Sequence, residues 1–81
     1  MNNTSISVTV KFFATLRQYG PDKEILIIPE NSKVKILFDK YSIPNDERRA
    51  IILVNGQPHK DLNTVLKHGD LISIFPPIGG G

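Results

Sequence analysis

Residues 5–12 read Ser5-Ile6-Ser7-Val8-Thr9-Val10-Lys11-Phe12, and an apolar residue stands at every second position. Because successive side chains of a strand point to opposite faces, this alternation predicts a strand with one buried face. Residues 24–28 are again rich in branched apolar residues, and Pro29 ends the run. The turn signal Gly20-Pro21-Asp22 lies between the two segments, so we expect them to form a hairpin.

A helix is expected after the hairpin. Four apolar residues follow at the i, i+3, i+4, i+7 spacing that places side chains on one helical stripe: Val34, Leu37, Phe38 and Tyr41. Asn31 and Ser32 precede this segment as N-cap residues, and Pro44 ends it. The sequence therefore predicts a helix of about three turns that covers the apolar face of the sheet.

Two further strands complete the expected sheet. Residues 50–54 are apolar and are followed by Asn55-Gly56, which favours a tight hairpin turn. After an irregular connection, residues 71–75 form the last strand, which Pro76 ends because proline cannot donate to a ladder. The order predicts an α+β fold: a mixed sheet of four to five strands with one main helix packed across one face. We place this domain at residues 1–76 and a flexible Gly-rich tail at residues 77–81.

Size and composition exclude several classes of function. A chain of 81 residues holds one domain with one small core. The net charge of +2 is spread along the chain, so nucleic-acid binding is not expected. The absence of cysteine removes disulfides, thiolate metal ligands and thiol nucleophiles. The polar N-terminal residues and the lack of a long apolar run predict neither signal peptide nor membrane span, so we expect a cytoplasmic protein.

The side chains suggest little chemistry of their own. His59 and His68 stand in no spaced cluster with carboxylates or thiols, so we expect surface histidines, no metal site and no bound cofactor. Five basic residues fit a solvated rim better than a docking patch: Lys33, Lys35, Lys40, Arg48 and Arg49. By strand alternation Phe75 points away from Ile72 and Ile74. It is therefore either an exposed anchor for a partner or a side chain packed beneath a loop.

The final residues Pro76-Pro77-Ile78-Gly79-Gly80-Gly81 add little to a core, because glycine has no side chain to bury. The prolines stiffen the exit from the last strand, and the glycines leave the path beyond it sterically open. Extended at about 3.3 to 3.6 Å per residue, residues 77–81 reach on the order of 16 to 18 Å. Such a thin tip can enter a narrow active site of another protein. A frayed terminus without function is the plainer interpretation.

The group that this tip would deliver is the main-chain carboxylate of Gly81. At neutral pH it is an anion and a poor electrophile. Adenylation by a partner that uses ATP would activate it, and a sulfur nucleophile could then displace AMP and leave a thiocarboxylate. The chain has no GxxxxGK phosphate loop, so the activation has to come from outside.

Three motifs are spread along the chain from residue 13 to residue 81: Phe13-Ala14-Thr15-Leu16-Arg17, Val54-Asn55-Gly56, and the terminal run from Gly69-Asp70 through Phe75-Pro76-Pro77 to the closing glycines. They resemble the Phe-Ala-x-Leu-Arg segment, the hairpin turn and the Gly-Asp-x-(Val/Ile)-x-x-Phe-Pro-Pro-x-x-Gly-Gly signature of the MoaD/ThiS-type sulfur carriers. This family has the ubiquitin-like β-grasp fold, which the resemblance implies for this chain.

The resemblance also implies a carrier that is not itself an enzyme. Gly81 would carry the acyl-adenylate and then the thiocarboxylate, while the preceding segment would bind partner enzymes: Phe75, Pro76, Pro77, Ile78, Gly79 and Gly80. The Phe-Pro-Pro stem is more typical of the MoaD branch, the small subunit of the sulfurtransferase molybdopterin synthase. The implied partners are a large subunit resembling MoaE and an E1-like adenylating enzyme resembling MoeB, which uses ATP.

Three alternatives remain open. The chain could carry sulfur for the thiazole of thiamin. It could be a ubiquitin-like modifier conjugated to lysines through Gly81, since an amine can attack the same acyl-adenylate. It could also be an interaction domain whose tail is idle.

Overall fold

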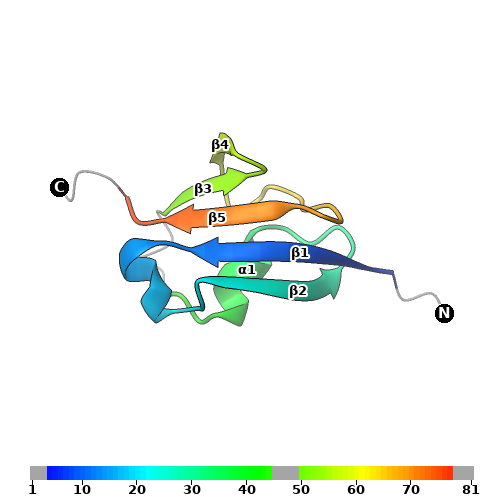
Figure 1. The fold of residues 1–81 in the computed structure, drawn as a ribbon. Coiled ribbons are helices and arrows are strands. Elements are labelled where there is room, and N and C mark those ends of the chain that lie inside the picture. The colour runs from blue at the N-terminus through cyan, green and yellow to red at the C-terminus, as the bar shows by residue number, and fades with distance from the viewer. Residues whose placement is uncertain (1–3, 45–49, 78–81) are drawn as a thin grey trace.

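The computed structural model describes residues 4–44 and 50–77, which form a five-stranded sheet with one short α-helix across one face (Figure 1). The strands are β1 (Ser5–Phe12), β2 (Lys23–Pro29), β3 (Ile51–Val54), β4 (Gln57–Lys60) and β5 (Leu71–Phe75). Their order is β2-β1-β5-β3-β4, with β1 and β5 parallel and every other neighbouring pair antiparallel. The predicted mixed sheet and its predicted β1–β2 hairpin are therefore confirmed.

The core lies between the sheet and the helix α1 (Lys35–Lys40). The apolar positions of β1 are all buried, and Val10 and Phe12 have no exposed surface. From the helix segment, Val34, Leu37 and Phe38 are also fully buried. Each large side chain buried in this way stabilises the fold by about 1.5–3 kcal/mol, so the alternation of β1 and the helical stripe together account for the packing of the two layers.

The helix is shorter than the sequence predicts. It has six residues, which at about 3.6 residues per turn is fewer than two turns. The predicted side-chain cap is wrong, because Val34 occupies the N-cap position and makes no side-chain hydrogen bond there. Asn31 instead adopts φ 67°, and Ser32 Oγ donates to the carbonyl of Pro29 at 2.6 Å. Both residues belong to the turn that ends β2, so they are unavailable to the helix.

The C-terminal end of the helix also comes before its predicted stop. Ser42 adopts φ 56°, and the helix ends at Lys40, ahead of Pro44. Tyr41 follows directly and is half-buried, with its ring edge against Phe12 at a centroid distance of 4.8 Å. The predicted apolar stripe therefore packs as expected, although its last member lies beyond the regular helix.

Two elements have no counterpart in the predicted order. The 3-10 helix η1 (Ala14–Gln18) lies in the β1–β2 connection and buries Leu16 completely. The strand β4 follows Asn55-Gly56, whose φ values of 55° and 80° are those of the predicted tight turn. Pro58 and a register shift opposite β3 interrupt the alternation of β4, which explains why its sequence does not look like a strand.

Candidate functional site

The predicted tail leaves the sheet from a strand that is paired on both sides. β5 lies between β1 and β3, and Phe13 N donates to the carbonyl of Ile74 at 3.1 Å beyond the end of β1. Phe75 is still paired opposite Ile51. Pro76 is half-buried and Pro77 is exposed. The main chain is thus held by the sheet up to Phe75, and the stem, Pro76-Pro77, starts from a fixed base.

Phe75 is stacked on Phe13. The ring centroids are 4.2 Å apart and the ring planes differ by 11°, and both side chains are half-buried. Phe75 was expected to be either an exposed anchor or a side chain packed beneath a loop. The structure combines features of both, because the ring packs against the segment after β1 and keeps part of its surface exposed. Phe13 was not among the predicted site residues. Phe13 directly follows the buried Phe12, so strand alternation places it on the opposite face of the sheet, the face that Phe75 shares. This alternation is the sequence signal that could have indicated its contact with Phe75.

The base of the stem belongs to the face of the sheet opposite the helix. Residues paired in register share a face, so the pairs Lys11–Ser73, Leu53–Ser73 and Ile51–Phe75 place these side chains together. We call this surface the stem face and define it by six half-buried residues: Lys11, Phe13, Ile51, Leu53, Ser73 and Phe75. It is a mainly apolar surface that is continuous with the stem.

Lysine supplies the charge of the stem face. Lys11 Nζ lies 5.5 Å from the centroid of the Phe13 ring, and Lys11 is paired opposite Lys23 of β2. Like charges directly opposite one another weaken strand pairing. The neighbouring Glu24 offers no compensation, because it is paired opposite the buried Val10 and accepts a hydrogen bond from Tyr41. The two lysines therefore make this part of the surface electropositive.

The Phe-Ala-x-Leu-Arg motif fastens the β1–β2 connection. Arg17 forms a salt bridge with Asp22 at 2.9 Å, and its Nε donates to the carbonyl of Phe12 at 3.4 Å. Gly20 lies against the Phe12 ring, where an added Cβ would be 2.6 Å from the nearest ring carbon. These contacts stabilise the β1–β2 connection, and the motif supplies no reactive group.

The Asn-Gly and Gly-Asp motifs are joined by one hydrogen-bond cluster. Asn55 Nδ2 donates to Asp70 Oδ1 at 2.9 Å, and Leu71 N donates to Asn55 Oδ1 at 2.9 Å. Asn55 N donates to the carbonyl of Leu71 at 2.8 Å, and Lys67 N donates to Asp70 Oδ2 at 2.8 Å. The cluster ties the β3–β4 turn to the start of β5, so these motif residues are structural.

Tyr41 is the described residue with a clearly shifted pKa. Burial, and then its hydrogen bond to Glu24, raises the pKa of the Tyr41 phenol well above its ordinary value. This contact joins the end of α1 to β2. It lies on the helix side of the sheet, away from the stem face, and we assign it to stability.

The remaining polar residues bring together no catalytic cluster in the part of the chain that the structure describes. His68 is exposed, and its Nδ1 accepts a hydrogen bond from Ser7 N at 3.0 Å; the side chain of His59 lies outside the described part. Lys33, Lys35 and Lys40 are exposed, whereas Arg48 and Arg49 lie outside the described residues. Among residues 4–44 and 50–77, no group of three or more His, Asp or Glu could hold a metal ion.

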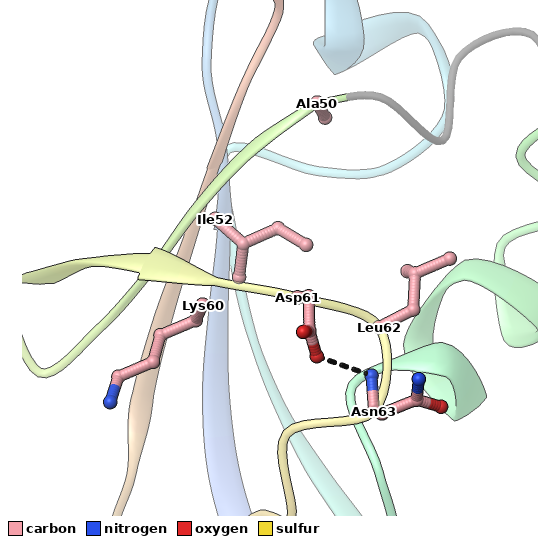
Figure 2. A pocket seen from close by; sticks show the side chains of 6 residues that line it. All are labelled: Ala50, Ile52, Lys60, Asp61, Leu62 and Asn63. Atoms are coloured by element: carbon pink, nitrogen blue, oxygen red, sulfur yellow. Dashed lines mark hydrogen bonds between the residues drawn. The ribbon is translucent and has the colours of Figure 1, made fainter.

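A surface hollow of about 350 Å³ lies on the β3–β4 side of the molecule (Figure 2). Its lining is Ala50, Ile52, Lys60, Asp61, Leu62 and Asn63. The Asp61 carboxylate accepts a hydrogen bond from Asn63 N at 2.8 Å, so it stabilises the local turn. The hollow offers no pair of groups suited to acid–base or nucleophilic chemistry, and the stem remains the candidate site.

The outermost predicted site residues are not tested by the structure. Ile78, Gly79, Gly80 and Gly81 lie outside the described residues, so their roles and the division into a domain at residues 1–76 and a tail at 77–81 stay predictions. No helix of the described segments is long and apolar enough to span a membrane.

Comparison with known proteins places these observations in a family. The sequence model of the ThiS family matches residues 10–81. Small archaeal modifier protein 1 from Methanosarcina acetivorans is 32% identical, with a TM-score of 0.66, over 96% of this chain and 99% of that one. A Pyrococcus furiosus protein provisionally assigned as molybdopterin converting factor subunit 1 is 29% identical, with a TM-score of 0.71, over 90% and 99%.

A third solved structure contains a related chain bound to a second protein. It is the complex of subunits 1 and 2 of the molybdopterin-converting factor from Helicobacter pylori; the match is 26% identical, with a TM-score of 0.60, over 94% of this chain and 100% of that one. No curated protein sequence gives a significant match. The predicted ubiquitin-like β-grasp fold is confirmed by the strand order and by the structural match to a ubiquitin from Caldiarchaeum subterraneum, 16% identical with a TM-score of 0.59 over 96% of this chain and 100% of that one.

Proposed function

Since this chain belongs to the ThiS family, we propose that it is a sulfur carrier, itself without catalytic activity, whose reactive group is the carboxylate of Gly81. The observation that carries the proposal is the stem: Pro76-Pro77 leaves a strand paired on both sides, in a molecule whose other described motifs serve the fold. A reactive main-chain end needs this arrangement, because a partner can bind the fixed base while the tip enters its active site.

The proposed chemistry takes place in two steps on a partner enzyme. The Gly81 carboxylate attacks the α-phosphorus of ATP, giving the acyl-adenylate and pyrophosphate. A sulfur nucleophile at the oxidation level of sulfide then attacks the carbonyl carbon, and AMP leaves with the C–O electron pair. The product is the thiocarboxylate, and no oxidant or reductant is consumed. This chain supplies the carboxylate and the docking surface, and the E1-like enzyme, resembling MoeB, supplies ATP and the catalytic groups.

We place the sulfur in molybdopterin synthesis, with this chain as the small subunit of the synthase. Two of the similar proteins are described as subunit 1 of a molybdopterin converting factor, and one of them is bound to subunit 2. A large subunit resembling MoaE is therefore the favoured receiver. The stem face fits such a partner, because apolar and aromatic side chains at its centre can be covered while Lys11 remains at its margin.

Protein modification is the second candidate function. The 32% identity to small archaeal modifier protein 1 favours it. Its first step is the same adenylation, after which a lysine amine attacks the carbonyl carbon and AMP leaves, giving an isopeptide bond. Sulfur transfer to thiamin thiazole is a third destination, and it uses the same thiocarboxylate.

Intact-mass analysis distinguishes these functions. The chain is incubated with a MoeB-like activating enzyme, ATP and sulfide, and the expected product has gained the mass difference between sulfur and oxygen. Addition of the MoaE-like subunit and a pterin precursor should return the carrier to its original mass. Isopeptide-linked adducts would instead favour the modifier. No change with an enzyme that charges another carrier would contradict both.

Deletion of Gly81 is the matched control for this experiment. The shortened chain should not be charged, because it presents a different carboxylate at a different reach. Its thermal unfolding should match that of the full chain, since a terminal residue beyond the last strand contributes little burial. A charged product from the shortened chain would show that the reactive group lies elsewhere.

A further inference from the structure

The two edges of the sheet are protected to different degrees. Figure 1 shows β2 at one edge and β4 at the other. β4 has four residues, contains Pro58 and is paired with a register shift, which are all features that prevent further strand addition. β2 has seven residues and pairs with β1 in uninterrupted register. Its only proline is its last residue, so its edge is open along most of its length.

The main-chain groups on the open edge of β2 can be assigned from its pairing. Phe12 N donates to the carbonyl of Asp22, and Glu30 N donates to that of Thr4, each at 3.2 Å. In an antiparallel pair the hydrogen-bonded residues alternate with residues whose N–H and C=O point away. In both bonds the residue on the β2 side, Asp22 or Glu30, is even-numbered. The even-numbered residues of β2 therefore bond to β1, and the main-chain groups of Lys23, Ile25 and Ile27 point outward.

The same residues expose apolar side chains. Ile25 is 65% exposed and Ile27 is 70% exposed. Both are branched residues that favour strands, and they lie together on the face opposite the helix. Natural proteins usually protect an edge strand with charge, proline or a bulge, because an unprotected apolar edge pairs with other strands. An edge that combines free donors and acceptors with two exposed isoleucines has the properties of an interface.

We propose that β2 pairs antiparallel with β2 of a second copy of this chain, joining the two sheets across a two-fold axis near Ile25. The edge is self-complementary in this arrangement. Ile25 lies opposite Ile25 of the other copy, Lys23 lies opposite Ile27, and the outward N–H and C=O groups of all three residues are satisfied. The pairing stops at Pro29, since its carbonyl already accepts hydrogen bonds from the N–H and the Oγ of Ser32.

The charges of β2 are compatible with this pairing. Four residue positions separate the two copies of Lys23 along the paired strands, which at about 3.3 Å per residue is about 13 Å. This exceeds the screening length of about 10 Å at 0.1 M salt. Glu24 lies on the helix face, where it accepts the hydrogen bond of Tyr41. Antiparallel pairing therefore brings no like charges into contact.

The stem remains accessible in this dimer. β1 separates β2 from β5 in the sheet, so the paired edges lie away from the strand that bears Pro76-Pro77. Because β5 runs antiparallel to β2 and the two β2 strands pair antiparallel, the two stems of the dimer leave in opposite directions.

The first test uses the unaltered chain. Sedimentation equilibrium between about 10 µM and about 1 mM, a range suited to weak association, should show the mass rising from the 9.0 kDa of one chain toward twice that value. Hydrogen exchange followed by NMR locates the contact. As the concentration rises, the amides of Lys23, Ile25 and Ile27 should exchange about tenfold more slowly when most chains are paired. The amide of Leu26 should not change, because β1 already protects it.

Variants distinguish pairing through the β2 edge from non-specific association of exposed apolar residues. The double variant Ile25→Lys/Ile27→Lys should remain at 9.0 kDa over the same range, while Val65→Lys, at another exposed apolar residue, 46% exposed, should associate like the original chain. Should the lysine variant not fold, Ile25→Thr/Ile27→Thr keeps the preference for strands and should associate about tenfold less tightly.

Three results would overturn the proposal. The original chain could stay at 9.0 kDa at every concentration. Its mass could double without slower exchange at Ile25 and Ile27, which would indicate a different interface. The β2 variants could lose binding to the MoaE-like subunit while the original chain stays monomeric, which would assign the edge to that partner. Sulfur loading at Gly81 is measured separately, so none of these results bears on the carrier function.

Discussion

Phe75 is the last paired residue of the sheet before the stem, and its ring stacks on the ring of Phe13. The two rings lie parallel at 4.2 Å, and Phe13 follows β1 directly, so the last residue of the sheet is supported by the chain next to the first strand. Aromatic pairs of this kind contribute about 0.5–1.5 kcal/mol beyond burial. We therefore expect the stack to help set the starting direction of the stem, with Phe13 as its positioning residue.

Replacing Phe13 by leucine should weaken binding to the MoaE-like subunit. Loss of the stack, at about 0.5–1.5 kcal/mol, corresponds to about 2- to 13-fold in the dissociation constant. Titration calorimetry measures it, and Phe13→Tyr, which keeps the ring, is the matched control. Equal binding by all three chains would show that the stack does not orient the stem.

Gly20 is the second residue whose identity depends on an aromatic ring. A Cβ at this position would lie 2.6 Å from a ring carbon of Phe12, which is fully buried and cannot move aside. We expect Gly20→Ala to lower the free energy of unfolding by about 1–3 kcal/mol, as overpacking does elsewhere. Urea unfolding measures this loss. In the Phe12→Leu background the added methyl group should cost less, and an unchanged cost would place the strain elsewhere.

At the scale of the elements, the start of β5 is held by the Asn55 cluster. Asn55→Gly removes the hydrogen bonds to Asp70 and Leu71 while keeping a residue suited to φ 55°. It should lower the free energy of unfolding by about 1–2 kcal/mol. Asn55→Ala should cost about 1 kcal/mol more, because alanine is strained in the left-handed region. Equal losses in urea unfolding would contradict this division between hydrogen bonds and backbone strain.

The junction between α1 and β2 should make stability depend on pH in the alkaline range. The pKa of Tyr41 is raised in the fold, so folding favours the protonated phenol. Its contribution is fully present below the unfolded pKa of about 10 and is lost as the pH rises toward the folded value. Above about pH 10 the stability of the original chain should therefore fall more steeply than that of Tyr41→Phe. Parallel stability curves for the two chains would contradict the expectation.

The elements also show what the sequence could predict. The alternation in β1 and the stripe Val34, Leu37 and Phe38 reflect burial, which a linear pattern records. The length of α1 was predicted wrongly, because the turn after β2 uses Asn31 and Ser32 and only the folded chain shows this competition. β4 and the Phe13–Phe75 stack depend on pairing between distant segments, which no local pattern contains.

At the scale of the whole molecule, the electropositive margin of the stem face should favour acidic partners. Lys11 is paired opposite Lys23 with no carboxylate between them, and such charges act mainly on the rate of association. We expect Lys11→Glu to slow association with the MoaE-like subunit about 3- to 10-fold at low salt. Lys40→Glu, on the helix side, changes the net charge equally and should have less effect. Stopped-flow mixing measures both rates, and equal slowing would show that only net charge matters.

The parallel pairing of β1 with β5 has a consequence for biosynthesis. Within this sheet β1 leaves the ribosome before β5 and needs β5 as its neighbour, so the native topology cannot close until β5 has been translated. A chain that stops before β5 lacks the central strand of the sheet and is open to proteolysis. A polypeptide that can offer the Pro76-Pro77 exit to an enzyme is therefore one in which the strand that closes the sheet has already been synthesised.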